Sequence, residues 1–124
     1  MMNRWILFGA ISAFISVGMG AFGAHALATK LSAHALSIYQ TAAQYQMYHA
    51  LALIFVGLWS IHRQDPTLPI AGWAFTVGSF LFSGSLYALA LSDVRILGAI
   101  TPFGGICFLI GWASVAISAL PKNL

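Results

Sequence analysis

The side chains best suited to chemistry lie in residues 39–50, a stretch with the sequence YQTAAQYQMYHA that runs directly into apolar residues 51–59. His49 is the side chain in this stretch that can exchange a proton near neutral pH or ligate a metal or haem. Tyr45 and Gln46 beside it can donate and accept hydrogen bonds. Inside a membrane, such groups mark either a functional site or a polar contact between helices.

Both interpretations of His49 stay open at the level of sequence: a ligand or proton acceptor, or the commoner role of hydrogen bonding a neighbouring helix. His25 is a weak partner for a metal or haem, because a rise of about 1.5 Å per residue separates the two histidines by roughly 12 Å in depth. Both carboxylates of the chain, Asp65 and Asp93, fall in predicted loops. This excludes the usual proton relay and paired-carboxylate hydrolysis. We therefore expect a non-catalytic protein without a cofactor or metal.

Composition defines the class of protein. The chain has 124 residues, of which 60% are hydrophobic and 6% are charged, whereas soluble domains carry about 25% charged residues. We expect a single-domain, all-α integral membrane protein. The lone cysteine, Cys107, excludes a disulfide framework. Five basic residues scattered singly form no surface for nucleic acid.

Four apolar segments predict four transmembrane helices, since about 20 apolar residues cross the hydrocarbon. Their predicted bounds are 5–27, 35–61, 70–91 and 101–120. Ser32 is expected to cap the second helix, and Thr101 to cap the fourth with Pro102 in its first turn. Two prolines predict a non-helical loop over residues 62–69. In the first helix, small residues at three- and four-residue spacing predict a close packing face. These are Gly9, Ala13, Ser16, Gly20 and Ala24.

Short connections favour an up-down-up-down bundle with both termini on one side. Arg4, Arg63 and Lys122 fall on that side, and Lys30 and Arg95 on the other. Because basic residues accumulate on the cytoplasmic side, we expect cytoplasmic termini.

Counting residues along the helices places most polar side chains in the half of the bundle away from the termini, which predicts a cavity closed at one end. The candidate polar site comprises His25, Tyr39, Gln44, Tyr45, Gln46, His49, Ser83 and Thr101. Unpaired amide or imidazole groups in hydrocarbon cost several kcal/mol. We therefore expect Gln46 and His49 to face the bundle and to bond the first or third helix. Ser16 and Ser83 are the expected partners at matching depth, and Tyr45 and Tyr48 the local alternatives.

Four ordered motifs cover nearly the whole chain: GAFGAHAL at 20–27, YxTAxxYQxYHAL at 39–51, GSxYxLAL at 84–91, and GxITPxGG at 98–105 followed by Gly111 and Trp112. Together they resemble the YgdD-like family of small bacterial membrane proteins, defined by a domain of unknown function (domain 423). The resemblance implies four transmembrane helices and the bacterial inner membrane. It implies no substrate, reaction or cofactor.

Three functional hypotheses follow. The first is a non-catalytic integral membrane protein whose polar half binds a small molecule, a lipid or a partner helix. The second is a small transporter or channel subunit that acts as an oligomer. The third is a membrane-embedded enzyme or redox protein that uses His25 and His49. The expected partners are the lipid bilayer and, in a homo-oligomer, further copies of the chain.

Overall fold

The computed structural model describes residues 1–122, which are all-helical with connecting turns. Helix α1 spans Arg4–Phe22 and begins at Asn3, whose side-chain oxygen accepts the backbone N–H of Ile6 at 3.2 Å. It continues into a π-helical turn, Gly23–Leu27. Helix α2, Ala33–His62, is 30 residues long and is capped by Ser32, whose hydroxyl accepts the N–H of Ala35 at 3.1 Å. The predicted Ser32 cap is therefore confirmed.

The second half of the chain forms one interrupted helix followed by another. Helix α3, Thr67–Ser79, passes through a π-helical turn, Phe80–Gly84, into α4, Ser85–Ser92. Asp93 ends α4 in the left-handed conformation, with φ 57°. A 3-10 turn, Arg95–Ala99, leads into α5, Thr101–Ser118.

Two expectations about helix starts are corrected. Helix α3 begins at Thr67, so Pro69 lies in its first turn rather than in a loop. That position tolerates proline because the first backbone N–H groups of a helix have no partner within it. Thr101 is the first helical residue of α5 and not its cap. Its hydroxyl instead lies 2.6 Å from that of Ser85.

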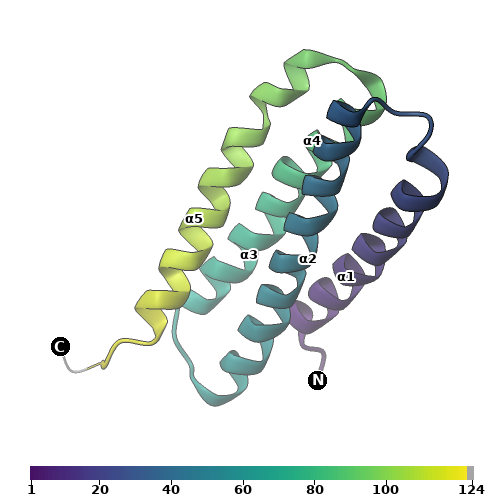
Figure 1. Ribbon diagram of the computed structural model, residues 1–124. Coiled ribbons are helices and arrows are strands. Elements are labelled where there is room, and N and C mark those ends of the chain that lie inside the picture. Colours follow the sequence, from purple (N-terminus) through teal and green to yellow (C-terminus); the bar gives the residue numbers. More distant parts are fainter. Residues whose placement is uncertain (123–124) are drawn as a thin grey trace.

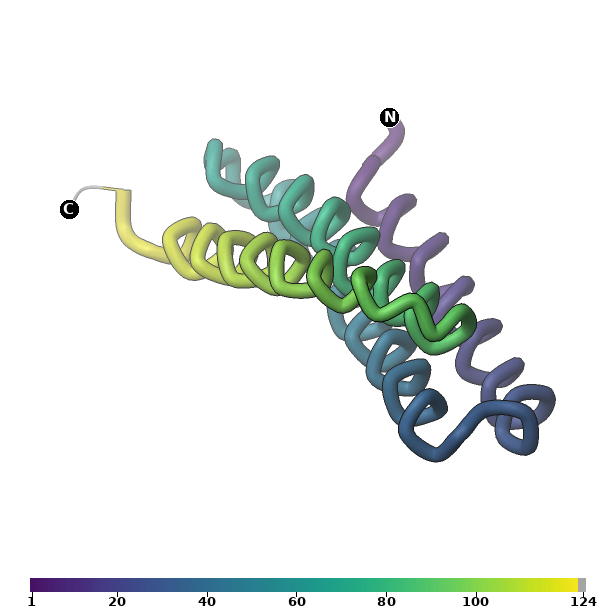
Figure 2. Tube along the Cα trace, turned by 90° about the horizontal axis from the view of Figure 1, so that it is seen from above, coloured from purple at the N-terminus to yellow at the C-terminus, as the bar shows by residue number. Residues whose placement is uncertain are grey.

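The helices pair as two hairpins that meet along α2 and α3–α4. Helix α1 packs on α2, and α5 packs on α3, while α2 also contacts α3 and α4 (Figure 1). Viewed from above, α1 and α5 lie on opposite sides of this central pair (Figure 2). Among the described residues, α1 has no comparably extensive contact with α3, α4 or α5. The start of α1 and the end of α5 lie at the same end of the bundle (Figure 1).

The larger of two core clusters sits in the half near the termini, where buried apolar side chains of all four long helices meet: Trp5, Ala52, Leu53, Val56, Leu68, Ala71, Phe75 and Phe108. Glycine allows the closest approaches. A Cβ on Gly9 would lie 2.6 Å from the carbonyl oxygen of Ala50. The predicted packing face of small residues on α1 is confirmed at Gly9 and Ser16, which are buried. It is not confirmed at Gly20, where an added Cβ would meet nothing within 4 Å.

Three helical stretches are long and apolar enough to cross a membrane: Arg4–Leu27, Thr67–Ser92 and Arg95–Ser118. Helix α2 is longer than each of them. It falls outside this set because glutamine, tyrosine and histidine interrupt its apolar sequence.

Candidate functional site

A groove separates α1 from α3–α4, and α2 forms its floor. It encloses about 480 Å³. The walls are largely apolar, with a few hydroxyl and amide groups and no charged side chain. The lining residues are Phe8, Ile11, Ser12, Ile15, Met19, Gln46, Leu53, Trp73, Thr76, Ser79, Phe80, Ser83, Gly84 and Tyr87. The volume falls within the range of about 300–1,000 Å³ that is usual for small-molecule sites.

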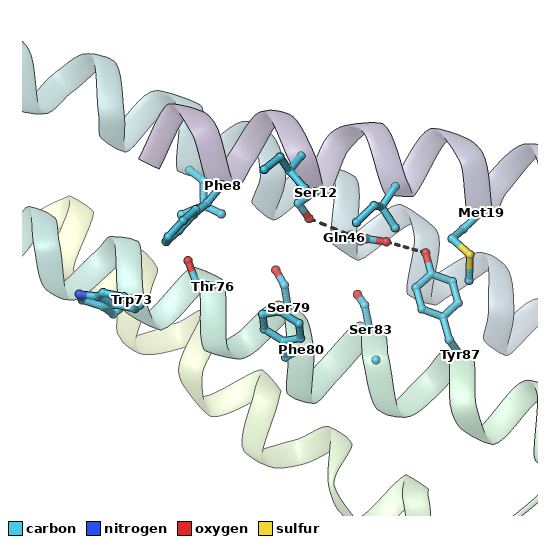
Figure 3. Close-up of a pocket in the computed structure, with 14 residues that line it drawn as sticks. Phe8, Ser12, Met19, Gln46, Trp73, Thr76, Ser79, Phe80, Ser83 and Tyr87 are labelled. Carbon is cyan, nitrogen blue, oxygen red and sulfur yellow. Dashed lines mark hydrogen bonds between the residues drawn. The ribbon is translucent and has the colours of Figure 1, made fainter. Parts of the chain in front are cut away.

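Two serines on the α3–α4 wall carry buried hydroxyls without hydrogen-bond partners within the described residues: Ser79 and Ser83. Ser83 is only 1% exposed. Both hydroxyls point across the open space toward α1 (Figure 3). Thr76, one turn before Ser79, differs because its hydroxyl donates to the carbonyl of Gly72 at 2.8 Å. Buried polar groups are almost always paired in folded proteins. The two unpaired hydroxyls therefore mark this wall as a candidate binding surface.

The π-helical turn Phe80–Gly84 shapes this part of the wall. Such a turn inserts one residue into an α-helix, and it occurs frequently at functional sites. Ser79 is the last residue of α3, and Ser83 lies within the turn. The insertion therefore changes which side chains after Ser79 point into the groove.

Gln46 lines the groove and links three helices. Its Nε2 donates to the hydroxyl of Ser12 on α1 at 3.3 Å. Its Oε1 accepts the hydroxyl of Tyr87 on α4 at 2.7 Å (Figure 3). The prediction that Gln46 faces the bundle and bonds the first or third predicted helix is confirmed, and the side chain bonds both.

His49 lies on a different side of α2, against α5. The imidazole is 4% exposed and stacks on Phe108 with 3.5 Å between ring centroids. Its Nδ1 lies 2.8 Å from the carbonyl oxygen of Tyr45, and its Nε2 accepts the indole N–H of Trp112 at 3.1 Å. Because a carbonyl only accepts and an indole only donates, Nδ1 carries the proton. Both ring nitrogens are therefore occupied, and neither is free to ligate a metal.

The expected partners of His49 need correction. Ser16 donates instead to the carbonyl of Ala43 at 2.7 Å, and Ser83 faces the groove. The local alternative, Tyr45, does contact His49, but through its backbone carbonyl. Trp112 was missed because equal depth along two helices does not determine which faces meet. The GW pair at 111–112 was the available signal, because Gly111 lets α5 approach Phe75 of α3 closely and Trp112 beside it carries an indole donor.

Two other members of the predicted site pack beside these clusters. The ring of Tyr39 lies edge-on to that of Tyr87 with 5.2 Å between centroids, and the ring of Tyr45 lies 6.3 Å from the imidazole of His49. The hydroxyl of Tyr39 donates to the carbonyl of Met19 at 2.6 Å, next to the first π-helical turn. The ring of Tyr45 stacks on Phe82 with 4.8 Å between centroids. Together with the Thr101–Ser85 pair, these contacts tie neighbouring helices.

His25 and Gln44 do not join the others, which corrects the single cluster expected from sequence. His25 is exposed within the turn Gly23–Leu27. Gln44 is exposed on the far side of α2 from Gln46, because two residues turn a helix by about 200°. Nor do the described residues contain a group of three histidine, cysteine, aspartate or glutamate side chains placed to hold a metal.

The fold and the groove define a helical membrane protein with a largely apolar cleft between its first and third long helices. The family model described as "Protein of unknown function (DUF423)" matches residues 19–105. The chain therefore belongs to this family of small membrane proteins, as its motifs predicted.

Curated relatives match nearly end to end. A UPF0382 membrane protein of Staphylococcus epidermidis is 50% identical over 119 residues, covering 96% of this chain and 97% of the relative. One from Staphylococcus aureus is 46% identical over 117 residues, covering 94% and 95%. The UPF0382 membrane protein YwdK of Bacillus subtilis is 43% identical over 120 residues, covering 96% and 98%. No solved structure matches the chain significantly.

Proposed function

We propose that all four long helices cross the bacterial cytoplasmic (inner) membrane, with α2 as the fourth span and both termini in the cytoplasm. Helix α2 is about 45 Å long at 1.5 Å per residue, more than the roughly 30 Å of hydrocarbon. Its neighbours α1 and α3–α4 cover Gln46, and α5 covers His49. An interior face of this kind lets a polar helix reside in a bilayer.

We further propose that the protein is not an enzyme and that it binds a membrane-soluble small molecule in the groove. The observation that carries this proposal is the pair of buried, unpaired hydroxyls of Ser79 and Ser83 in an otherwise apolar cleft. A hydroxyl both donates and accepts. The bound molecule accordingly has an apolar body and a carbonyl, ether or hydroxyl group at the level of these serines.

The depth of the Ser79 hydroxyl in the bilayer limits which class of ligand can pair with it. Ser79 is near the midpoint of the stretch Thr67–Ser92, so its hydroxyl lies near the middle of the bilayer. The polar part of a phospholipid begins about 15 Å from that level. Acyl chains could fill the groove but would leave both serines unpaired, which favours a ligand whose polar group resides within the hydrocarbon.

The competing hypotheses have less support. Histidine-dependent catalysis needs a free imidazole nitrogen in the membrane interior, whereas both nitrogens of His49 are hydrogen bonded and His25 is exposed. A transport path needs continuous polar groups. The Gln46 network, the His49 cluster and the Thr101–Ser85 pair are instead separate.

Native mass spectrometry from mild detergent tests the proposal. Wild-type protein is expected to retain a non-phospholipid mass. Ser79→Ala/Ser83→Ala is expected to raise its dissociation constant about eightfold and so to lower its occupancy, since membrane hydrogen bonds average about 0.6 kcal/mol each. Thr76→Val is the matched control, because Thr76 lines the same wall but bonds its own helix. Equal occupancy in the double variant, or phospholipid alone in every sample, would refute a serine-bound ligand.

A further inference from the structure

The outward face of α2 carries a continuous, largely exposed stripe. The stripe, called here the α2 seam, consists of Ser37, Thr41, Gln44, Tyr48, Leu51, Phe55, Leu58 and His62. Thr41 is half-buried and the others are exposed, with the large apolar members about half exposed. The spacing alternates strictly between four and three residues. That 3.5-residue period is the pattern by which two helices pack along a left-handed coiled-coil seam.

Gln44 is the anomalous member of the α2 seam. It lies about 5 Å from the midpoint of α2 at 1.5 Å per residue, well inside a hydrocarbon layer of roughly 30 Å. Its amide makes no hydrogen bond within the described residues. Ser37 and Thr41 differ, because their hydroxyls donate to the carbonyls of His34 and Ser37. A lone amide facing lipid is costly, so Gln44 requires a partner from outside this chain.

A second copy of the chain carries a matching amide. Copies inserted with the same orientation are related by a two-fold axis along the membrane normal, so α2 meets α2 in parallel and each residue faces its counterpart. An amide carries both donors and an acceptor. Gln44 is thus complementary to itself, as an unpaired lysine or aspartate would not be.

We propose that the protein forms a parallel homodimer along the α2 seam, with the two Gln44 amides hydrogen bonded across the axis. A polar residue that pairs with its own counterpart at one position of such a seam sets the register of the two helices. Leu51, Phe55 and Leu58 supply the apolar contact in the half nearer the termini.

The dimer leaves the groove open. Gln46 and Leu53 line the groove, whereas Gln44 and Leu51 lie two residues earlier and about 200° around the helix. The groove and the α2 seam therefore lie on opposite faces of α2, and dimerisation does not depend on ligand binding.

Disulfide trapping of the full-length protein in native membranes tests the dimer. In a Cys107→Ser background, Tyr48→Cys and Leu51→Cys are expected to form disulfide-linked dimers. Phe14→Cys on α1 and Leu109→Cys on α5 are the controls, because both positions are exposed near mid-membrane. Equal trapping at the controls would overturn the proposal. So would linkage only between Ser37→Cys and Leu58→Cys copies, which indicates antiparallel helices, or linkage only to a different protein.

The role of Gln44 is tested separately by single-molecule counting in lipid vesicles. Gln44→Leu is expected to raise the dimer dissociation constant about three- to eightfold, from the loss of one or two membrane hydrogen bonds. Gln44→Asn, which keeps the amide, should restore most of the association. Gln40→Leu, one turn away and exposed but outside the α2 seam, is the control. An unchanged dissociation constant for Gln44→Leu would refute amide pairing.

Discussion

Adjacent glycines in α5 offer a sharp test of the packing within the second hairpin, where α5 lies against α3–α4. A Cβ added to Gly104 would lie 2.7 Å from the Cβ of Phe82 and 2.8 Å from its Cα, whereas non-bonded carbon atoms prefer about 3.5–4.0 Å. Phe82 belongs to the π-helical turn, so its backbone cannot rotate away as a flexible side chain would. A Cβ added to Gly105 would meet nothing within 4 Å.

The two substitutions should therefore have opposite effects on stability. Gly104→Ala forces α5 away from the turn, and overpacking of this kind costs about 1–3 kcal/mol. Gly105→Ala adds a methyl group in open space and replaces a poor helix former, which is favourable by up to about 1 kcal/mol. The difference in the free energy of unfolding between the variants is thus about 1–4 kcal/mol.

Two measurements follow unfolding in detergent. Circular dichroism reports helix loss, and a thiol-reactive fluorophore reports exposure of Cys107, which is half-buried at the α3–α5 contact. Gly104→Ala should lower both midpoints, and Gly105→Ala should leave them unchanged or raise them. If Gly105→Ala proved as destabilising as Gly104→Ala, the close backbone contact at Phe82 would not be what holds α5 in place.

Three further predictions address other parts of the molecule. A double-mutant cycle of His49→Leu and Trp112→Phe should give a coupling energy of about 0.6 kcal/mol in mixed-micelle unfolding, and a value near zero would show that their 3.1 Å hydrogen bond contributes nothing. In the loop before α3, the hydroxyl and then the backbone N–H of Thr67 donate to Asp65 and hold the pKa of this carboxyl below its usual range. The stabilisation is thus present above the unfolded pKa of about 3.9 and lost as pH falls through the folded pKa; carboxyl chemical shifts should show Thr67→Ala raising the pKa, and an unchanged value would contradict this cause. Finally, Lys30→Cys should react with a membrane-impermeant thiol reagent in intact cells and Gln64→Cys should not, both in a Cys107→Ser background; labelling of position 64 alone would reverse the proposed orientation.

The sequence by itself determined the properties that depend on composition and on the order of residues along the chain. A bilayer selects long apolar segments, so composition and segment length alone identified a helical membrane protein. The Ser32 cap was predictable because it depends on residues close in sequence. The inward orientation of Gln46 was predictable because small residues on the same face of α2 allow other helices to approach.

Only the tertiary structure decided which helix faces meet. Depth along a helix can be counted from sequence, but the direction of a side chain around the axis depends on how glycines let helices approach. The π-helical turns add a further rotation, because an inserted residue turns everything after it by about 100°. For these reasons His49 meets Trp112 rather than Ser16, Ser79 and Ser83 face an open groove, and Gln44 lies outside the bundle.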